Sequence, residues 1–234
     1  MRIEEVVNRK TRKAFHNAAR RIYQHNDTWV CPMDKEIESI FQDGKNVFLT
    51  HGEATRWVLY NEQKQLIGRI AAFIDRNMAY KQDQPTGGVG FFECIDSQEA
   101  ANILFDTAKQ WLAERGMMAM DGPINFGETD KYWGLLVDGF THPSYEITYN
   151  HPYYQALFES YGFKTYYRQE GFHLDVQKDM PERFVRIAER VANKPGYEFR
   201  HFEWKHSDRY VHDFAVVFNE AWASFKENFE PLKP

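Results

Sequence analysis

The sequence predicts an α/β protein built on a mixed β-sheet with helices on both faces. Strand-like and helix-like patterns alternate along the chain, and several strand patterns follow one another with no helix between them. A strictly alternating order would predict an all-parallel sheet, so the direct strand-to-strand connections favour a mixed one. The length of 234 residues and the 43% content of hydrophobic residues suffice for one large domain, or for one domain and part of another.

The N-terminal segment predicts a short strand followed by an amphipathic helix. Residues 2–7 include β-branched types, and Asn8 is a good helix N-cap. The helix has an apolar stripe at helical spacing, formed by Phe15, Ala18, Ala19 and Ile22. Much of its remaining surface is basic, through Arg9, Lys10, Arg12, Lys13, Arg20 and Arg21. That basic face is either simply solvated or a contact for an anionic ligand or a membrane surface.

The middle of the chain predicts a hairpin, a central strand and a long helix. Residues 29–41 predict a loop and a short helix, and the β-rich runs 56–60 and 66–74 flank a polar turn. A glycine-rich run at 87–90 opens a strand that extends to Ile95. Asp96 or Ser97 then caps a helix that Gly116 ends. The later patterns predict strands at 117–120, 145–149 and 197–204, two strands within 163–176 with a break near 169–171, and helices at 152–161, 181–193 and 210–225.

Composition excludes several classes of function. The chain has 29 basic and 34 acidic residues, so its net charge of −5 argues against a nucleic-acid partner, which needs a basic surface. Cys31 and Cys94 are too few for a disulfide framework. No run approaches the ~20 apolar residues of a membrane helix, and the first residues lack the apolar segment of a secretory signal. These features predict a cytoplasmic protein.

Motif searches exclude metal-dependent and nucleophilic hydrolysis. The spacing of His201, His206 and His212 matches no metal-ligand template, so we expect no metal. Neither cysteine has an activating neighbour, and no Gly-x-Ser-x-Gly motif is present. The run Gly87-Gly88-Val89-Gly90 is not a phosphate-binding loop, because it precedes a strand and no Lys-Ser/Thr follows. It indicates either a tight turn or bulge, or a strand whose backbone approaches a ligand closely.

Aromatic residues are unusually frequent, at 16% of the chain. They are concentrated between Phe126 and Phe172, beyond what the helix stripes in this segment require. Such a cluster forms either an aromatic core that supports loops or the wall of an apolar acyl or lipid pocket with polar handles.

The end of this segment resembles the last motif of the GNAT superfamily of N-acyltransferases. A helix ending Leu157-Phe158-Glu159-Ser160-Tyr161 is followed by Gly162-Phe163, and the order of elements before it is similar to the GNAT plan over about residues 1–176. Three further runs resemble the bacterial ceramide-synthase-like branch of that superfamily: Gly122-Pro123-Ile124-Asn125, the run from Trp133 to Phe140, and Tyr149-Asn150-His151-Pro152-Tyr153-Tyr154.

The resemblance implies a GNAT-like domain at residues 1–178. Members of this branch carry a second GNAT-like half, and residues 214–231 resemble its opening helix, so we expect residues 179–234 to begin that half in a truncated chain. Two positions depart from the family pattern. The glycine-rich pyrophosphate loop is replaced by Ile95-Asp96-Ser97-Gln98-Glu99-Ala100, and Phe158 stands where the family has a tyrosine acid.

The resemblance implies N-acyl transfer from acyl-CoA or acetyl-CoA to a small-molecule or lipid amine, such as a sphingoid amine. A base would take the amine proton and an acid would protonate the thiolate. The candidate catalytic residues are Glu93, Tyr153, Tyr154 and Tyr161. The candidate cofactor-binding residues are Phe91, Phe92, Cys94, Ile95, Ser97 and Gln98, with oxyanion donors at 91–94. The candidate acceptor-binding residues are Asn125, Trp133, Tyr149 and Asn150.

Two alternatives to this enzyme remain open. The replaced pyrophosphate loop and Phe158 favour a catalytically silent GNAT-like domain that binds a lipid or a partner protein. A tRNA-dependent aminoacyl transferase would also use paired GNAT halves, but the acidic composition counts against it. The basic first helix leaves peripheral contact with a membrane surface open, and the sequence assigns no oligomeric state.

Overall fold

The computed structural model describes residues 1–81, 83–127, 131–175, 177–223 and 231–233. The chain divides into two compact units, residues 1–170 and 171–234. The first unit contains β1 (Arg2–Glu5), α1 (Arg9–Ile22), α2 (Asp34–Ile40), β2 (Gly52–Tyr60), β3 (Leu66–Asp75), α3 (Arg76–Ala79), β4 (Thr86–Cys94), α4 (Gln98–Ala113), β5 (Ala119–Asp121) and α5 (Tyr154–Tyr161), with a 3-10 turn at Val47–Thr50. The second contains α6 (Glu182–Ala192), a 3-10 turn at Trp204–His206 and α7 (Ser207–Trp222).

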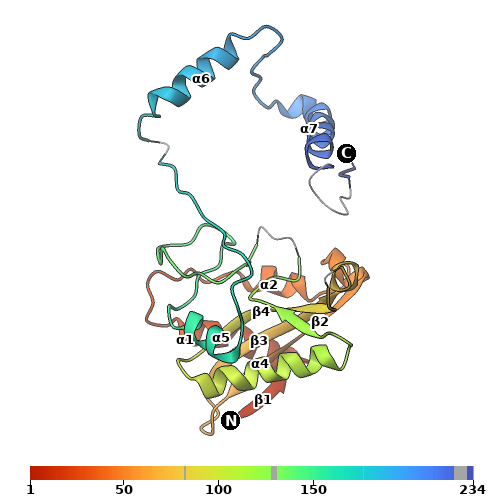
Figure 1. Ribbon diagram of the computed structural model, residues 1–234, viewed down its shortest axis with the longest axis vertical. Helices are drawn as coiled ribbons and strands as arrows, with labels where there is room; N and C mark the ends of the chain where they lie inside the picture. The colour runs from red at the N-terminus through yellow and green to blue at the C-terminus, as the bar shows by residue number, and fades with distance from the viewer. Residues whose placement is uncertain (82, 128–130, 176, 224–230, 234) are drawn as a thin grey trace. The chain divides into compact units, whose positions relative to one another are not determined.

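One five-stranded sheet organises the first unit, in the order β1-β2-β3-β4-β5 (Figure 1). The first four strands pair antiparallel, and β5 pairs parallel to β4. Alternate side chains of β2 face opposite layers, because Trp57 and Leu59 join the cluster under α4 and α5 whereas Val58 packs with α1. The predicted mixed α/β sheet with helices on both faces is therefore confirmed.

Local sequence signals fix the ends of the helices that support the sheet. The side chain of Asn8 accepts hydrogen bonds from the backbone N–H groups of Lys10 and Thr11, which caps α1 as predicted. Ser97 caps α4 through the N–H of Ala100. Gly162 ends α5 in the left-handed conformation, with a φ of 116°.

Four of the predicted strands are wrong. The described residues of 145–149, 163–176 and 197–204 form no strand; Val176 lies outside the described residues, as do 224 and 225 of the last predicted helix. Alternating apolar residues form a strand only where a neighbouring strand supplies hydrogen bonds. The last strand of the sheet, β5, has only three residues, all paired with β4. The segment after Gly162 remains largely exposed.

Candidate functional site

The candidate site is built around Glu93, at the end of β4. Glu93 and Arg69 are register partners on β4 and β3, so their side chains share one face of the sheet. Both residues are buried, with 8% and 4% of their surface exposed. One oxygen of the Glu93 carboxylate lies 3.4 Å from Nη2 of Arg69. The ion pair thus rests on a single long contact.

Helix α5 brings a tyrosine to the other carboxylate oxygen. The hydroxyl of Tyr154 donates to Oε2 of Glu93 at 2.7 Å and accepts from the backbone N–H of Cys94 at 2.9 Å. The hydroxyl of neighbouring Tyr153 donates to the carbonyl of Cys94 at 2.8 Å. The end of β4 is therefore hydrogen-bonded to α5, and the N–H of Cys94, one of the predicted oxyanion donors, already has a partner.

Burial changes the acid–base properties of this cluster. It raises the pKa of Glu93 above its ordinary value, and this effect outweighs the opposing charge of Arg69 and the hydrogen bonds of Tyr23 and Tyr154. Burial also raises the pKa of Tyr154 well above its ordinary value. The pKa of the Cys94 thiol rises to about 12, chiefly through burial. Cys94 is therefore no nucleophile near neutral pH, whereas Glu93 is suited to accept a proton.

A bulge in β4 shapes the backbone beside Glu93. The pairing with β3 shifts from Arg69–Glu93 to Ala71–Gly90, so Phe91 and Phe92 together lie opposite one residue. Phe91 has a φ of 49°, in the left-handed region that a phenylalanine rarely adopts. Both phenylalanines line the cavity described next.

A cavity of about 80 Å³ adjoins this cluster. Its wall is mainly aromatic and apolar, and its polar groups include Glu93, Arg69, Tyr154 and Thr148. The other lining residues are Trp29, Val30, Pro32, Ile37, Phe91, Phe92, Pro123, Tyr132, Leu135, Pro143, Ile147, Tyr149, Asn150 and Phe158. An apolar cavity with few polar groups and a carboxyl of shifted pKa is typical of a substrate site.

The structure brings six of the predicted site residues to this cavity: Phe91, Phe92, Glu93, Tyr149, Asn150 and Tyr154. The other predicted residues lie outside its lining. Tyr161 donates to Asp106, and the indole N–H of Trp133 donates to Tyr167. Asn125 is buried, and its Oδ1 has no hydrogen-bond partner among the described residues.

Asn150 organises the cavity wall. Its amide oxygen accepts from the N–H of Leu136, and its amide nitrogen donates to the carbonyls of Leu136 and His151. These three bonds join the loop at 136 to the start of α5. The neighbouring Tyr149 accepts from the side-chain amide of Asn26 at 3.1 Å. Tyr149 and Asn150, two of the four predicted acceptor-binding residues, thus already have structural partners.

The junction between β4 and α4 does not fit a CoA pyrophosphate. Ser97 caps the helix, and the amide of Gln98 donates to Asn102 and to the carbonyl of Leu157. Asp96 and Glu99 are exposed at the same helix end, where their charges oppose an anion. The residues predicted to bind cofactor here therefore serve the fold, and they leave no glycine-lined backbone for phosphates.

The glycine run in β4 accommodates the protein's own backbone. A Cβ at Gly90 would lie 1.9 Å from the carbonyl oxygen of Ile124, and one at Gly88 would lie 2.2 Å from the ring of Phe73. Glycine is therefore required at both positions for packing within the first unit.

Arg69 is the important site residue that the sequence reasoning missed. It is the one charged residue between Leu66 and Ile74, in a strand that is otherwise apolar except for its glycine. A charged residue inside a buried strand is rare unless it is paired, and that pattern was available as a signal. Its partner could not be identified before the register of β3 and β4 was known.

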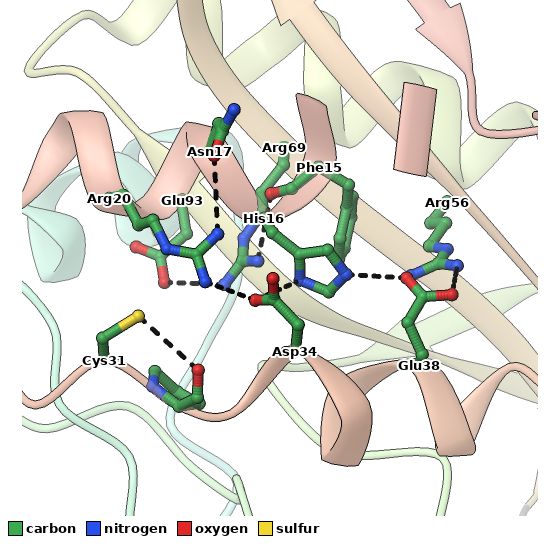
Figure 2. A network of polar contacts seen from close by, with 11 residues as sticks. Phe15, His16, Asn17, Arg20, Cys31, Asp34, Glu38, Arg56, Arg69 and Glu93 are labelled. Atoms are coloured by element: carbon green, nitrogen blue, oxygen red, sulfur yellow. Dashed lines mark hydrogen bonds and ion pairs between the residues drawn. The ribbon is translucent and has the colours of Figure 1, made fainter. Parts of the chain in front are cut away.

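A second charged cluster joins α1 to α2 near the site (Figure 2). Arg56 donates to both oxygens of Glu38 at 2.8 Å each. The ring of His16 lies 2.7 Å from Glu38 on one side and 3.3 Å from Asp34 on the other. The second cluster therefore fixes α2, which contributes Ile37 to the cavity wall.

No group of three or more histidine, cysteine and acidic side chains is placed to hold a metal ion in the described part of the chain. No helix within the described ranges is long and apolar enough to cross a membrane.

Comparisons with known proteins show which proteins the chain is similar to. No family model matches the chain. It is 26% identical to the bacterial ceramide synthase of Caulobacter vibrioides over 90% of its own length and 55% of that protein. It is 28% identical to protein YghO of Escherichia coli over 69% of its length and 41% of that protein. The chain thus spans about half the length of the curated relatives it matches.

The solved structures similar to this chain include a putative acetyl transferase from Pyrococcus furiosus, which covers 74% of this chain with a TM-score of 0.42 and 15% identity. Glucosamine-6-phosphate N-acetyltransferase from Arabidopsis thaliana covers 74% of this chain and 98% of its own, with a TM-score of 0.43 and 8% identity. The chain is an α/β protein that is similar in sequence to bacterial ceramide synthase, so the resemblance predicted from its motifs is confirmed.

Proposed function

We propose that this chain is an acyl-CoA-dependent N-acyltransferase of the GNAT type, acting on an amine. The observation that carries the proposal is Glu93, a buried carboxylate with a raised pKa that lines an aromatic cavity and is hydrogen-bonded to Tyr154. The similarity to bacterial ceramide synthase supports the same class of reaction.

The amine nitrogen attacks the carbonyl carbon of the acyl thioester, forming the C–N bond as the C–S bond breaks. Glu93 accepts the proton that the amine loses. Tyr154 gives its proton to the departing thiolate and recovers one from Glu93 through their 2.7 Å hydrogen bond. The products are an amide and a free thiol, and both side chains return to their starting state. The proposed oxyanion donors are backbone N–H groups in the 91–94 segment other than that of Cys94, which bonds to Tyr154.

Tyr153 and Tyr161 are the other candidates for the acid. The hydroxyl of Tyr153 donates to the carbonyl of Cys94, and that of Tyr161 donates to Asp106. Only the hydroxyl of Tyr154 contacts Glu93 directly among these three. We therefore assign the proton transfer to Tyr154 first.

The proposed acceptor is a lipid amine. The aromatic wall of the cavity favours an alkyl chain, and Glu93 lies where an amine is needed. The exposed basic residues of α1, including Arg9, Lys10 and Lys13, would place the protein on an anionic membrane surface that supplies such a substrate. Sedimentation with vesicles containing anionic lipid would test this contact, and equal binding to uncharged vesicles would contradict it.

The test of the reaction uses the full 234-residue chain. The protein is incubated with palmitoyl-CoA and a long-chain amine, and amide formation is followed by mass spectrometry, with thiol release as a second readout. Glu93→Gln should abolish both, while Glu53→Gln, at an exposed ion pair outside the cavity, should leave both unchanged. Amide formation at an equal rate in Glu93→Gln would refute the assignment of the base.

A silent lipid-binding module is the second candidate function. Two observations favour it: Tyr154 occupies the N–H of Cys94, and the junction at 95–98 lacks a fit to pyrophosphate. Thermal denaturation with palmitoyl-CoA and with palmitate distinguishes the two. Stabilisation by the CoA ester supports the transferase, whereas stabilisation by palmitate alone supports the binding module.

We also propose that residues 179–234 begin a second GNAT-like half. Within this unit α6 and α7 expose apolar side chains, including Phe184 and Phe214, which a larger domain would bury. Limited proteolysis tests the boundary, because a linker between two units is cut first. We expect cleavage close to residue 178 and a resistant N-terminal fragment, and uniform digestion of that fragment would contradict the division.

A further inference from the structure

We propose that Arg69 and Thr148 determine acceptor specificity by binding an oxygen atom that the acceptor carries next to its amine. The inference rests on the proposed function, because it takes the amine to lie at Glu93. Both residues line the cavity, and Arg69 is also the ion-pair partner of Glu93.

The first observation concerns polar atoms that are buried without a partner. Within the described residues, three buried side-chain polar atoms make no hydrogen bond: Nε of Arg69, Oγ1 of Thr148 and Oδ1 of Asn125. Arg69 and Thr148 line the same cavity. Buried polar groups are nearly always hydrogen-bonded, because an unpaired one has lost its hydrogen bonds to water without replacement. Two such atoms at one cavity indicate that the ligand supplies the missing partners.

The second observation is the remaining bonding capacity of Arg69. Its guanidinium carries five N–H donors. Nη1 donates to the carbonyl of Phe15 at 3.2 Å, and Nη2 reaches Glu93 only at 3.4 Å. The face of the guanidinium lies 4.7 Å from the centre of the Phe15 ring, which offers no acceptor for the other N–H groups. Arg69 therefore has donors left for a ligand oxygen.

The contact between Arg69 and Glu93 sets the chemistry of the ligand. In the proposed reaction Glu93 binds the amine of the acceptor. The guanidinium of Arg69 can donate to an oxygen atom of the acceptor, and the hydroxyl of Thr148 can also bond to that oxygen. Because the two charged side chains touch, they favour a head group whose amine and oxygen are close neighbours. A hydroxyl, a carbonyl and a carboxylate share this chemistry. The cavity of about 80 Å³ exceeds the roughly 15 Å³ that one water needs, so it has room for such a head group.

The experiment measures binding to the full chain by calorimetry with matched probes. Octylamine is compared with the amino alcohol that adds one hydroxyl beside the amine, and with the amino acid that carries a carboxylate there. We expect one or both oxygen-bearing probes to bind about tenfold tighter than octylamine, the effect of one hydrogen bond to a charged group. The stronger of the two identifies the type of oxygen. Equal binding of all three probes overturns the inference.

Two variants connect this preference to the named residues. Thr148→Val should reduce the ratio of affinities about threefold or more, and Thr148→Ser should restore it. Thr141→Val is the matched control, because the hydroxyl of Thr141 bonds to the carbonyl of Gly139 and lies outside the cavity lining. Arg69→Lys should reduce the ratio further, since lysine lacks the planar fork of donors. An unchanged ratio in Thr148→Val and Arg69→Lys contradicts the assignment.

These outcomes are separable from those of the proposed reaction, because binding is measured without an acyl donor. If the chain prefers the oxygen-bearing probes but transfers no acyl group, the head-group site is supported and the proposed transferase reaction is contradicted. If the chain acylates octylamine as rapidly as the other probes, the transferase reaction is supported and the role of Arg69 and Thr148 in specificity is contradicted.

Discussion

Two arginine–glutamate pairs lie near the same phenylalanine, and they differ in how completely they are satisfied (Figure 2). The guanidinium groups of Arg56 and Arg69 lie 5.0 and 4.7 Å from the centre of the Phe15 ring. Arg56 holds Glu38 through two bonds of 2.8 Å, with His16 as a further partner. Arg69 holds Glu93 through one contact of 3.4 Å and leaves Nε without a partner among the described residues.

The pKa values of the two carboxyl groups shift in opposite directions. Burial works to raise the pKa of Glu38, but the hydrogen bonds and charges of Arg56 and His16 outweigh it, so the pKa falls below its ordinary value. At Glu93 burial dominates and the pKa rises. The first pair therefore keeps its carboxylate charged and fixes a helix, whereas the second keeps a carboxyl group ready to exchange a proton.

Among the predicted effects, the loss of activity in Glu93→Gln should be the largest. Loss of a general base costs about 10²–10⁴-fold in rate, so kcat/KM for acyl transfer should fall by that amount. The amide oxygen of the introduced glutamine can still accept from Tyr154, but Arg69 loses its charged partner, so the rate is measured per folded molecule and the melting temperature is recorded beside it. A variant that unfolds while its residual activity per folded molecule stays normal would assign Glu93 to the fold instead.

Arg56→Met should break the other pair and leave chemistry intact. Removing one partner of a buried ion pair costs about 3 kcal/mol, because the remaining charge loses its compensation. Urea unfolding should register this loss, with kcat per folded molecule little changed. Arg76→Met is the control, since its pair with Glu53 is exposed and should contribute no more than about 1 kcal/mol. Equal costs at the two positions would show that burial does not distinguish them.

The pH dependence of kcat/KM tests whether the pKa of Glu93 is raised. As a base, Glu93 acts only when deprotonated, so kcat/KM should rise tenfold per pH unit up to its pKa and then level off. That midpoint should lie above 4.5, the ordinary value, because burial raises the pKa against the opposing effects of Arg69, Tyr23 and Tyr154. A midpoint at or below 4.5 would mean that Arg69 dominates.

The sequence predicted the layers of the fold better than its last strands. Asn8, Ser97 and Gly162 specify helix ends by local chemistry, and each acts as expected. The two strands predicted within 163–176 fail because their patterns carry no information about a pairing partner. Strand identity is a tertiary property, whereas a helix cap is a local one.

Within the candidate site, the sequence predicted the carboxylate of Glu93 but not its partner Arg69. Glu93 stands out as an acid at the end of an apolar strand, and Tyr154 belongs to a recognisable motif. Arg69 and Thr148 come from a different strand and a different loop, and only the register of β3 with β4 and the course of the loop before α5 bring them to the cavity. The same limit explains why Tyr153 and Tyr161 could not be separated from Tyr154 by spacing alone.

His16 gives the smallest predicted effect, on stability below pH 6.5. Burial lowers its pKa from the ordinary 6.5, against the raising effects of Glu38 and Asp34 and together with the charge of Arg69. The unfolded chain then binds a proton before the folded chain does. Stability is therefore complete above pH 6.5 and decreases as pH falls toward the folded pKa, by at most about 1.4 kcal/mol per pH unit.

Urea midpoints measured from pH 7.5 to 5 test this slope. His16→Gln should remove part of it, and the remainder belongs to groups such as His151, whose pKa burial also lowers. Loss of the charged form of Glu38 affects stability only below about pH 4.5, so the two windows do not overlap. A wild-type chain that gains stability on acidification, and loses that gain in His16→Gln, would mean that the two flanking carboxylates outweigh burial and hold the histidine charged.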